Sequence, residues 1–137
     1  MNNKGFTLIE VIITLSILVV LSLILIPTVN TIIEKQNQNS LKNFVESVES
    51  ATLNYVKENK WELKWINCVD GNPSHSITIK ELIISNYLQP NIKNPVTKEE
   101  INIEDPNYTI IATYNCANKT FTAKASSDFK SAINLQS

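Results

Sequence analysis

The fold is decided by the stretch from Lys4 to Pro27, which reads KGFTLIEVIITLSILVVLSLILIP. No charged residue occurs from Val11 to Ile33. At the rise of about 1.5 Å per residue of an α-helix, this part would be roughly 35 Å long, enough to cross the apolar core of a bilayer. The sequence therefore predicts an N-terminal membrane helix with a single carboxylate, Glu10, near its start.

Two common kinds of membrane segment explain only part of this pattern. A secretory signal would use Lys4 as its positive end, but the apolar run passes into PTVNTIIEKQNQNS without a small-residue cleavage site. A plain anchor explains the length and Lys4 but not Glu10. A carboxylate at the centre of a membrane helix costs about 2.5–3.5 kcal/mol, less near an end, and such groups are usually paired.

Cleavage between Gly5 and Phe6 would supply a partner for Glu10. The new α-amine of Phe6 would be positively charged near neutral pH, and Glu10 lies four residues further along the same helix face. Glu10 can then pair within its own chain or with the amine of a neighbouring subunit. The second possibility would make Glu10 an assembly contact.

The stretch KGFTLIEV resembles the leader junction of type IV pilins and of pilin-like subunits of secretion and DNA-uptake systems. The resemblance implies that a membrane peptidase cuts after Gly5 and N-methylates Phe6, and that Glu10 guides docking into a filament. Many members of the family carry a helix-loosening proline at the end of the apolar half, where Pro27 falls. Proline lacks an amide hydrogen and clashes with the preceding turn, so we expect a kink or a locally loosened helix there.

The helical pattern resumes after Pro27 and predicts one helix from about Phe6 to about Glu58. Apolar residues recur there at steps of three and four, or their multiples, at Ile33, Leu41, Phe44, Val48, Ala51 and Tyr55. We expect a leader at residues 1–5, a membrane or filament-core half-helix at 6–29, and an extracytoplasmic head at 30–137 that includes the amphipathic half-helix.

The rest of the head is expected to be a small antiparallel sheet, which makes the fold class α+β. YTIIATYNC and KTFTAKAS are rich in β-branched and aromatic residues and predict a hairpin packed across the amphipathic half-helix. SITIKELIISNYL is interpreted as a short helix, with Thr78 as N-cap and Glu81 three residues later. One short strand is expected near Ile101–Ile103. Trp61 and Trp65 are expected to cover the base of the head or to form an exposed patch.

Composition limits the partners and the compartment. The net charge is −1 and all twelve basic residues are lysine, so the bidentate arginine contacts common in base recognition are unavailable. Nucleic acid is therefore not expected as a direct partner. Export by the N-terminal helix would place Cys68 and Cys116 outside the cytoplasm, where a disulfide persists and could stabilise the fold by roughly 4 kcal/mol. The alternative is a pair of buried free thiols.

Few residues offer chemistry. His75, the only histidine, follows Cys68 closely enough to suggest a nucleophile and a base, but no orienting third group or anion hole is apparent. Glu104 and Asp105 are too few for a calcium loop. We therefore expect no enzymatic activity, no cofactor and no metal.

The favoured hypothesis is a structural subunit, major or minor, of a type IV pilus-like filament. Its expected partners are other pilin subunits, the prepilin peptidase and the membrane platform for pilus assembly. It would lie in the cytoplasmic membrane with its head outside, and later in a pilus at the cell surface. The alternatives are a pseudopilin of a competence or type II secretion system and, from another class, a membrane-tethered binding module that retains its leader.

Overall fold

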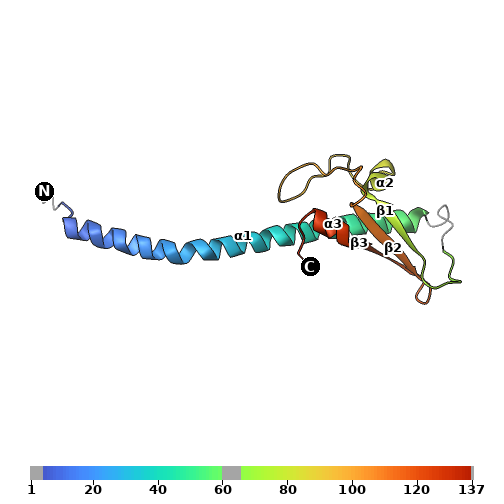
Figure 1. Ribbon diagram of the computed structural model, residues 1–137, viewed down its shortest axis with the longest axis horizontal. Coiled ribbons are helices and arrows are strands. Elements are labelled where there is room, and N and C mark those ends of the chain that lie inside the picture. Colours follow the sequence, from blue (N-terminus) through green and yellow to red (C-terminus); the bar gives the residue numbers. More distant parts are fainter. Residues whose placement is uncertain (1–4, 60–65, 137) are drawn as a thin grey trace. The chain divides into compact units, whose positions relative to one another are not determined.

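The computed structural model describes residues 5–59 and 66–136. Its secondary-structure elements follow the order helix, strand, helix, two strands and helix, so the predicted α+β class is confirmed. The chain falls into two compact units, residues 1–36 and 37–137, which are considered separately (Figure 1). Trp61 and Trp65 lie outside the described residues, so the prediction for them stays a prediction.

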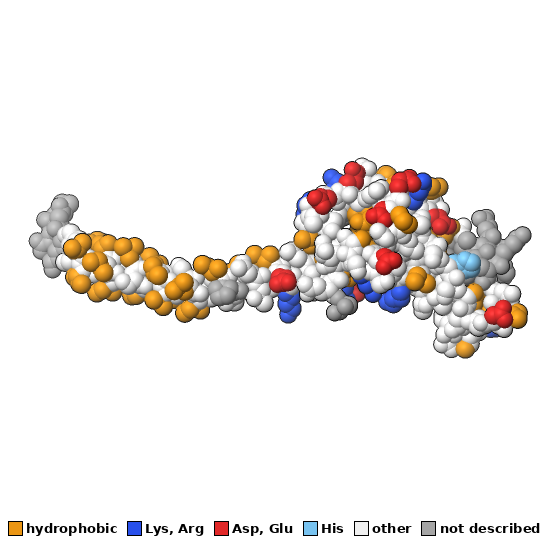
Figure 2. Space-filling model, viewed as in Figure 1, with side chains coloured by type: hydrophobic (Ala, Val, Ile, Leu, Met, Phe, Trp, Pro, Cys, Tyr) orange, Lys and Arg blue, Asp and Glu red, His pale blue; other side chains and the backbone are white. Residues whose placement is uncertain are grey.

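The first element, α1, spans Leu8–Asn59 and confirms the long helix expected from the sequence. Its first part is apolar, and the large side chains there are exposed, as Figure 2 shows for the face in view. The hydroxyl groups in this part bond back to carbonyl groups one turn earlier, as with Ser16 Oγ to Ile12 O at 2.8 Å and Ser22 Oγ to Leu18 O at 2.7 Å. Such bonds satisfy polar groups inside an apolar medium.

The second part of α1 forms one wall of the head's core. Its buried residues recur at helical spacing, at Leu41, Val45, Val48, Thr52, Tyr55 and Val56. Thr52, the polar member of this face, donates its hydroxyl hydrogen to the carbonyl oxygen of Val48 at 2.9 Å. The buried face of α1 therefore contains a polar residue whose hydroxyl group is hydrogen-bonded.

The other wall is a three-stranded antiparallel sheet of order β1-β2-β3. Strand β1 spans Ser74–Thr78, β2 spans Thr109–Asn115 and β3 spans Thr120–Ala125. The predicted hairpin is confirmed as β2 and β3, in register from Ile110 opposite Ala125 to Asn115 opposite Thr120. Its buried positions alternate, because successive side chains of a strand point to opposite faces.

The third strand is not where the sequence suggested. Residues 101–103 form no strand, and the only pairing in that loop is an isolated bridge between Lys93 and Glu100. The third strand is instead β1, which directly precedes the short helix α2, Ile79–Ile84, and overlaps the start of the segment interpreted as a short helix. Ile101 is 6% exposed and joins the core. Its apolar character therefore reflects burial in a loop rather than a sheet.

Two short helices close the head. Thr78 caps α2 as predicted, with its side-chain oxygen accepting the amide hydrogen of Glu81 at 3.2 Å. The last helix, α3 at Ser127–Ala132, was not expected from the sequence. It buries Phe129 completely, with ring contacts to Phe44 at 6.3 Å and to Tyr108 at 5.4 Å between centroids.

The ends of the head are fastened by polar and covalent contacts. Gln38 holds the C-terminal tail, donating to the Asn134 carbonyl at 3.2 Å and accepting the Gln136 amide hydrogen at 2.9 Å. At the opposite end, Cys68 and Cys116 form a disulfide with a Cα–Cα distance of 5.9 Å. This bond joins the loop that precedes β1 to the turn between β2 and β3.

Candidate functional site: the N-terminal junction

The residues expected to be cut, methylated and docked form a short segment at the start of α1. Phe6 is 80% exposed, and Leu8 is the first helical residue. Gly5, Phe6, Thr7 and Glu10 together line a shallow hollow open to the surroundings. The junction is thus accessible, and Glu10 lies in the first turn of α1, four residues beyond Phe6.

Thr7 caps this helix, which sequence reasoning missed. Its Oγ1 accepts the amide hydrogen of Glu10 at 3.3 Å, and its carbonyl oxygen accepts that of Val11 at 3.3 Å. The signal was present in TLIE, a threonine followed three residues later by glutamate, which is the pattern of a capping box. Glu10 also lies in the first turn, where a negative charge is favoured by the helix dipole.

Within the described residues, the carboxylate of Glu10 pairs with no side chain or backbone amide. The reciprocal bond of a capping box, in which the Thr7 amide would donate to the Glu10 carboxylate, is not formed. The cap therefore gives the backbone amide of Glu10 a hydrogen-bond partner, but it gives the charged side chain none. The carboxylate remains available for a positive group.

Within the described residues, no contact requires a glycine at position 5. A Cβ atom added there would meet nothing within 4 Å, and its backbone does not need the conformations reserved for glycine. The head offers a contrast, because Gly71 has φ of 107°, which strains other residues. The described residues therefore give no reason for a glycine at position 5.

Pro27 lies within the continuous helical assignment of α1. A proline removes one hydrogen bond from an α-helix, since its nitrogen carries no hydrogen. Near it, Thr28 donates its hydroxyl hydrogen to the Ile24 carbonyl at 3.3 Å. The kink remains a prediction.

The structure shows what the head residues considered for catalysis or metal binding contact. Cys68 is bonded to Cys116, so its sulfur is not available as a thiolate nucleophile. His75 lies in β1, opposite Ala112 of β2. Glu104 binds Lys80, with its Oε1 and Oε2 at 2.7 and 2.8 Å from Nζ. The Cys68 sulfur is therefore part of the expected disulfide, which is confirmed.

The start of the chain defines a class of protein. Within the described part, α1 is the one helix long and apolar enough to span a membrane. Residues 1–26 match the prokaryotic N-terminal methylation motif, the leader type of type IV pilins and pseudopilins. No curated protein and no solved structure matches the chain.

The chain therefore carries a pilin-type leader on a long helix with an α+β head. The motif supports a type IV pilin-like or pseudopilin precursor, a structural subunit rather than an enzyme. It also supports a prepilin peptidase and other pilin subunits as general partners, and the apolar helix fits membrane anchoring before assembly.

Proposed function

We propose that this chain is the precursor of a structural subunit of a type IV pilus-like filament. The observation that carries the proposal is the methylation motif at residues 1–26, continuous with an apolar half-helix whose side chains no other part of the described chain covers. Such a half-helix needs lipid or neighbouring helices around it.

The sequence of events begins in the membrane. The half-helix at residues 6–29 inserts with Lys4 on the cytoplasmic side, and the head at 30–137 folds outside, where its disulfide forms. The peptidase then removes residues 1–5 and methylates the amine of Phe6. An open junction, and a glycine that no contact among the described residues requires, support recognition of this site by the peptidase.

Assembly exchanges lipid contacts for contacts between helices. The carboxylate of Glu10, which lacks a partner among the described residues, neutralises the amine of Phe6 on a neighbouring subunit as the helix enters the filament core. Pairing removes the cost of leaving either charge alone in an apolar core. Loosening of the helix at Pro27 lets it adapt to the packing of the filament.

The first experiment is to determine the N-terminal residue and the intact mass of the protein from native cells. A chain beginning with N-methylated Phe6 supports processing by the peptidase. A chain still beginning with Met1, in cells that contain the peptidase, would contradict the proposal and favour a membrane-tethered binding module.

A further inference from the structure

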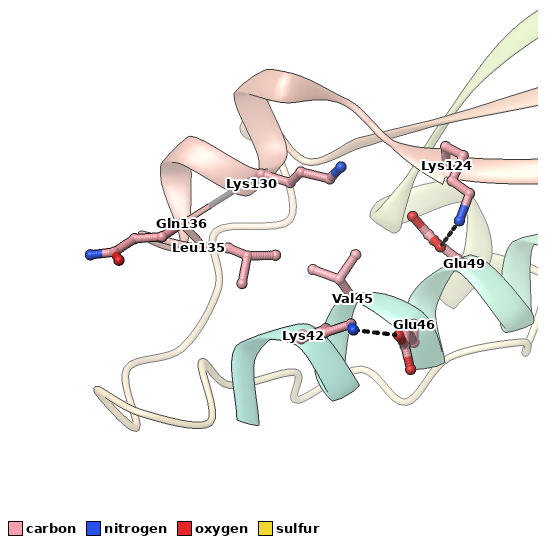
Figure 3. A pocket seen from close by; sticks show the side chains of 8 residues that line it. All are labelled: Lys42, Val45, Glu46, Glu49, Lys124, Lys130, Leu135 and Gln136. Atoms are coloured by element: carbon pink, nitrogen blue, oxygen red, sulfur yellow. Dashed lines mark hydrogen bonds and ion pairs between the residues drawn. The ribbon is translucent and has the colours of Figure 1, made fainter. Parts of the chain in front are cut away.

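A hollow of about 350 Å³ lies between α1 and α3 at the end of the head where the chain terminates. Figure 3 shows Val45 and Leu135 pointing toward one another across its floor. The lysine side chains around it are Lys42, Lys124 and Lys130. An apolar floor under a charged rim suits an apolar side chain accompanied by a polar one.

The rim carries an unbalanced positive charge. Lys42 lies 4.0 Å from Glu46, and Lys124 lies 3.3 Å from Glu49. Lys130, on α3, has no acidic partner among the described residues. A ligand with a carboxylate next to its apolar group would complete the pairing.

The other end of the head carries a group of this kind. Val69 is 80% exposed, more than any other large apolar residue described in the head. Asp70 follows it, and no described residue bonds to its carboxylate. Ile84 is 71% exposed, but the nearest acid on its helix, Glu81, is bonded to Tyr55. Of these two residues, Val69 is the one that combines strong exposure with an adjacent acid that no described residue bonds.

The loop that carries Val69 and Asp70 is held in place before any contact. The disulfide from Cys68 fixes its start, and Asn72 Oδ1 accepts the amide hydrogen of Cys116 at 3.0 Å. The Val69 amide itself donates to Asn67 Oδ1 at 3.3 Å. A loop fixed in this way loses little conformational entropy when it binds.

The loop and the hollow lie at opposite ends of the head. Lys124 is at the end of β3, whereas the turn containing Cys116 precedes its start. The strand between them has six residues, which corresponds to roughly 20 Å at the usual rise of a strand. A head cannot fill its own hollow across this distance.

We propose that the loop Val69–Asp70 of one copy binds in the hollow of the next copy, with Asp70 paired to Lys130 and Val69 on the floor of Val45 and Leu135. The contact joins two different surfaces, so its repetition generates an open chain of heads rather than a closed dimer. The inference rests on the proposed filament function and names the partner surface on the head, which is independent of the Glu10 contact.

The direct test is carbodiimide coupling of purified native filaments, followed by peptide mass spectrometry. This reagent joins a carboxylate and an amine that already touch, with loss of water. We expect a peptide linked between Asp70 and Lys130. Because these residues lie at opposite ends of one head, such a link must join two subunits.

Charge-reversal variants of the full chain provide a second test of the contact between Asp70 and Lys130. Asp70→Lys and Lys130→Glu are each expected to lower the yield of sheared filaments roughly tenfold, and the double variant to restore it, because like charges at a contact repel. Lys130→Gln, which introduces no repulsion, should have a smaller effect. The matched control is Lys93→Glu with Glu99→Lys, two exposed positions outside the hollow.

The outcomes separate this inference from the proposed function. Processed subunits in normal filaments, with no Asp70–Lys130 link and no effect of either reversal, would overturn the inference and leave the function standing. Retention of Met1, or absence of the chain from any filament, would overturn both. A reversal that lowers yield without rescue by the double variant also counts against the pairing, provided that the disulfide still forms.

Discussion

The amide of Glu10 donates a hydrogen bond to Oγ1 of Thr7 at 3.3 Å, so the residue expected to guide assembly is also part of a helix cap. The bond uses the backbone of Glu10 and leaves its carboxylate without a partner among the described residues. The backbone amide of Glu10 therefore contributes to the helix cap, and its carboxylate is left for assembly. Mutations can separate these two roles.

Removal of the charge should affect assembly and not processing. Glu10→Gln and Glu10→Ala are expected to leave insertion and cleavage intact and to lower incorporation into filaments about a hundredfold, because an unpaired amine in an apolar core costs roughly 3 kcal/mol or more. Quantitative immunoblots of sheared filaments and membranes measure this.

Thr7→Ala is the control for the helix cap. It removes the acceptor for the Glu10 amide but keeps the charge, and loss of a cap costs about 1 kcal/mol. We expect Thr7→Ala to incorporate far better than Glu10→Gln. Equal defects in both variants would mean that helix integrity rather than charge limits assembly.

The contact between α1 and α2 predicts a stability loss at alkaline pH. Tyr55 donates its hydroxyl hydrogen to Glu81 Oε1 at 2.7 Å. Burial, followed by this bond and the Glu81 charge, raises the pKa of Tyr55 from 10.0 to about 12. The folded state therefore holds this proton more tightly than the unfolded state. The stabilisation is complete below pH 10 and is lost as the pH rises toward 12.

Tyr55→Phe tests this linkage. It should lower the free energy of unfolding by about 1–3 kcal/mol at neutral pH, because the hydrogen bond to a charged acceptor is lost. It should also reduce the fall in stability between pH 10 and 12. Some slope should remain, because the bond to Glu58 raises the pKa of Tyr87 and burial raises that of Tyr108. Denaturant titrations of the detergent-solubilised protein measure both effects, and an unchanged slope would contradict the assignment.

The disulfide should contribute mainly to the stability of the head. It closes a loop with a sequence separation of 48 residues, for which the chain-entropy relation gives about 4 kcal/mol. The double variant Cys68→Ser with Cys116→Ser is expected to lower the denaturant midpoint accordingly. Membrane insertion and cleavage at Gly5 should be unaffected, since they depend on the other end of the chain. A midpoint that matches the native protein would show that the bond is dispensable.

The sequence by itself determined the parts governed by local patterns. The charge-free run after Glu10 requires a helix in an apolar medium, because only internal hydrogen bonds can satisfy its backbone there. The density of β-branched and aromatic residues predicted the hairpin of β2 and β3, and the Thr78 cap marked the start of α2. The motif around Gly5 and Phe6 is also local, which is why the sequence alone predicts the junction.

Tertiary structure decided what depends on distant neighbours. Ser74–Thr78 is a strand because β2 offers it an edge, and α3 forms because Phe129 finds a fully buried site between Phe44 and Tyr108. The hollow brings together Lys42 and Lys130, which are far apart in the sequence. The periodicity of the sequence does not predict these contacts between distant residues. They depend on burial and strand pairing, which exist only once the chain has folded.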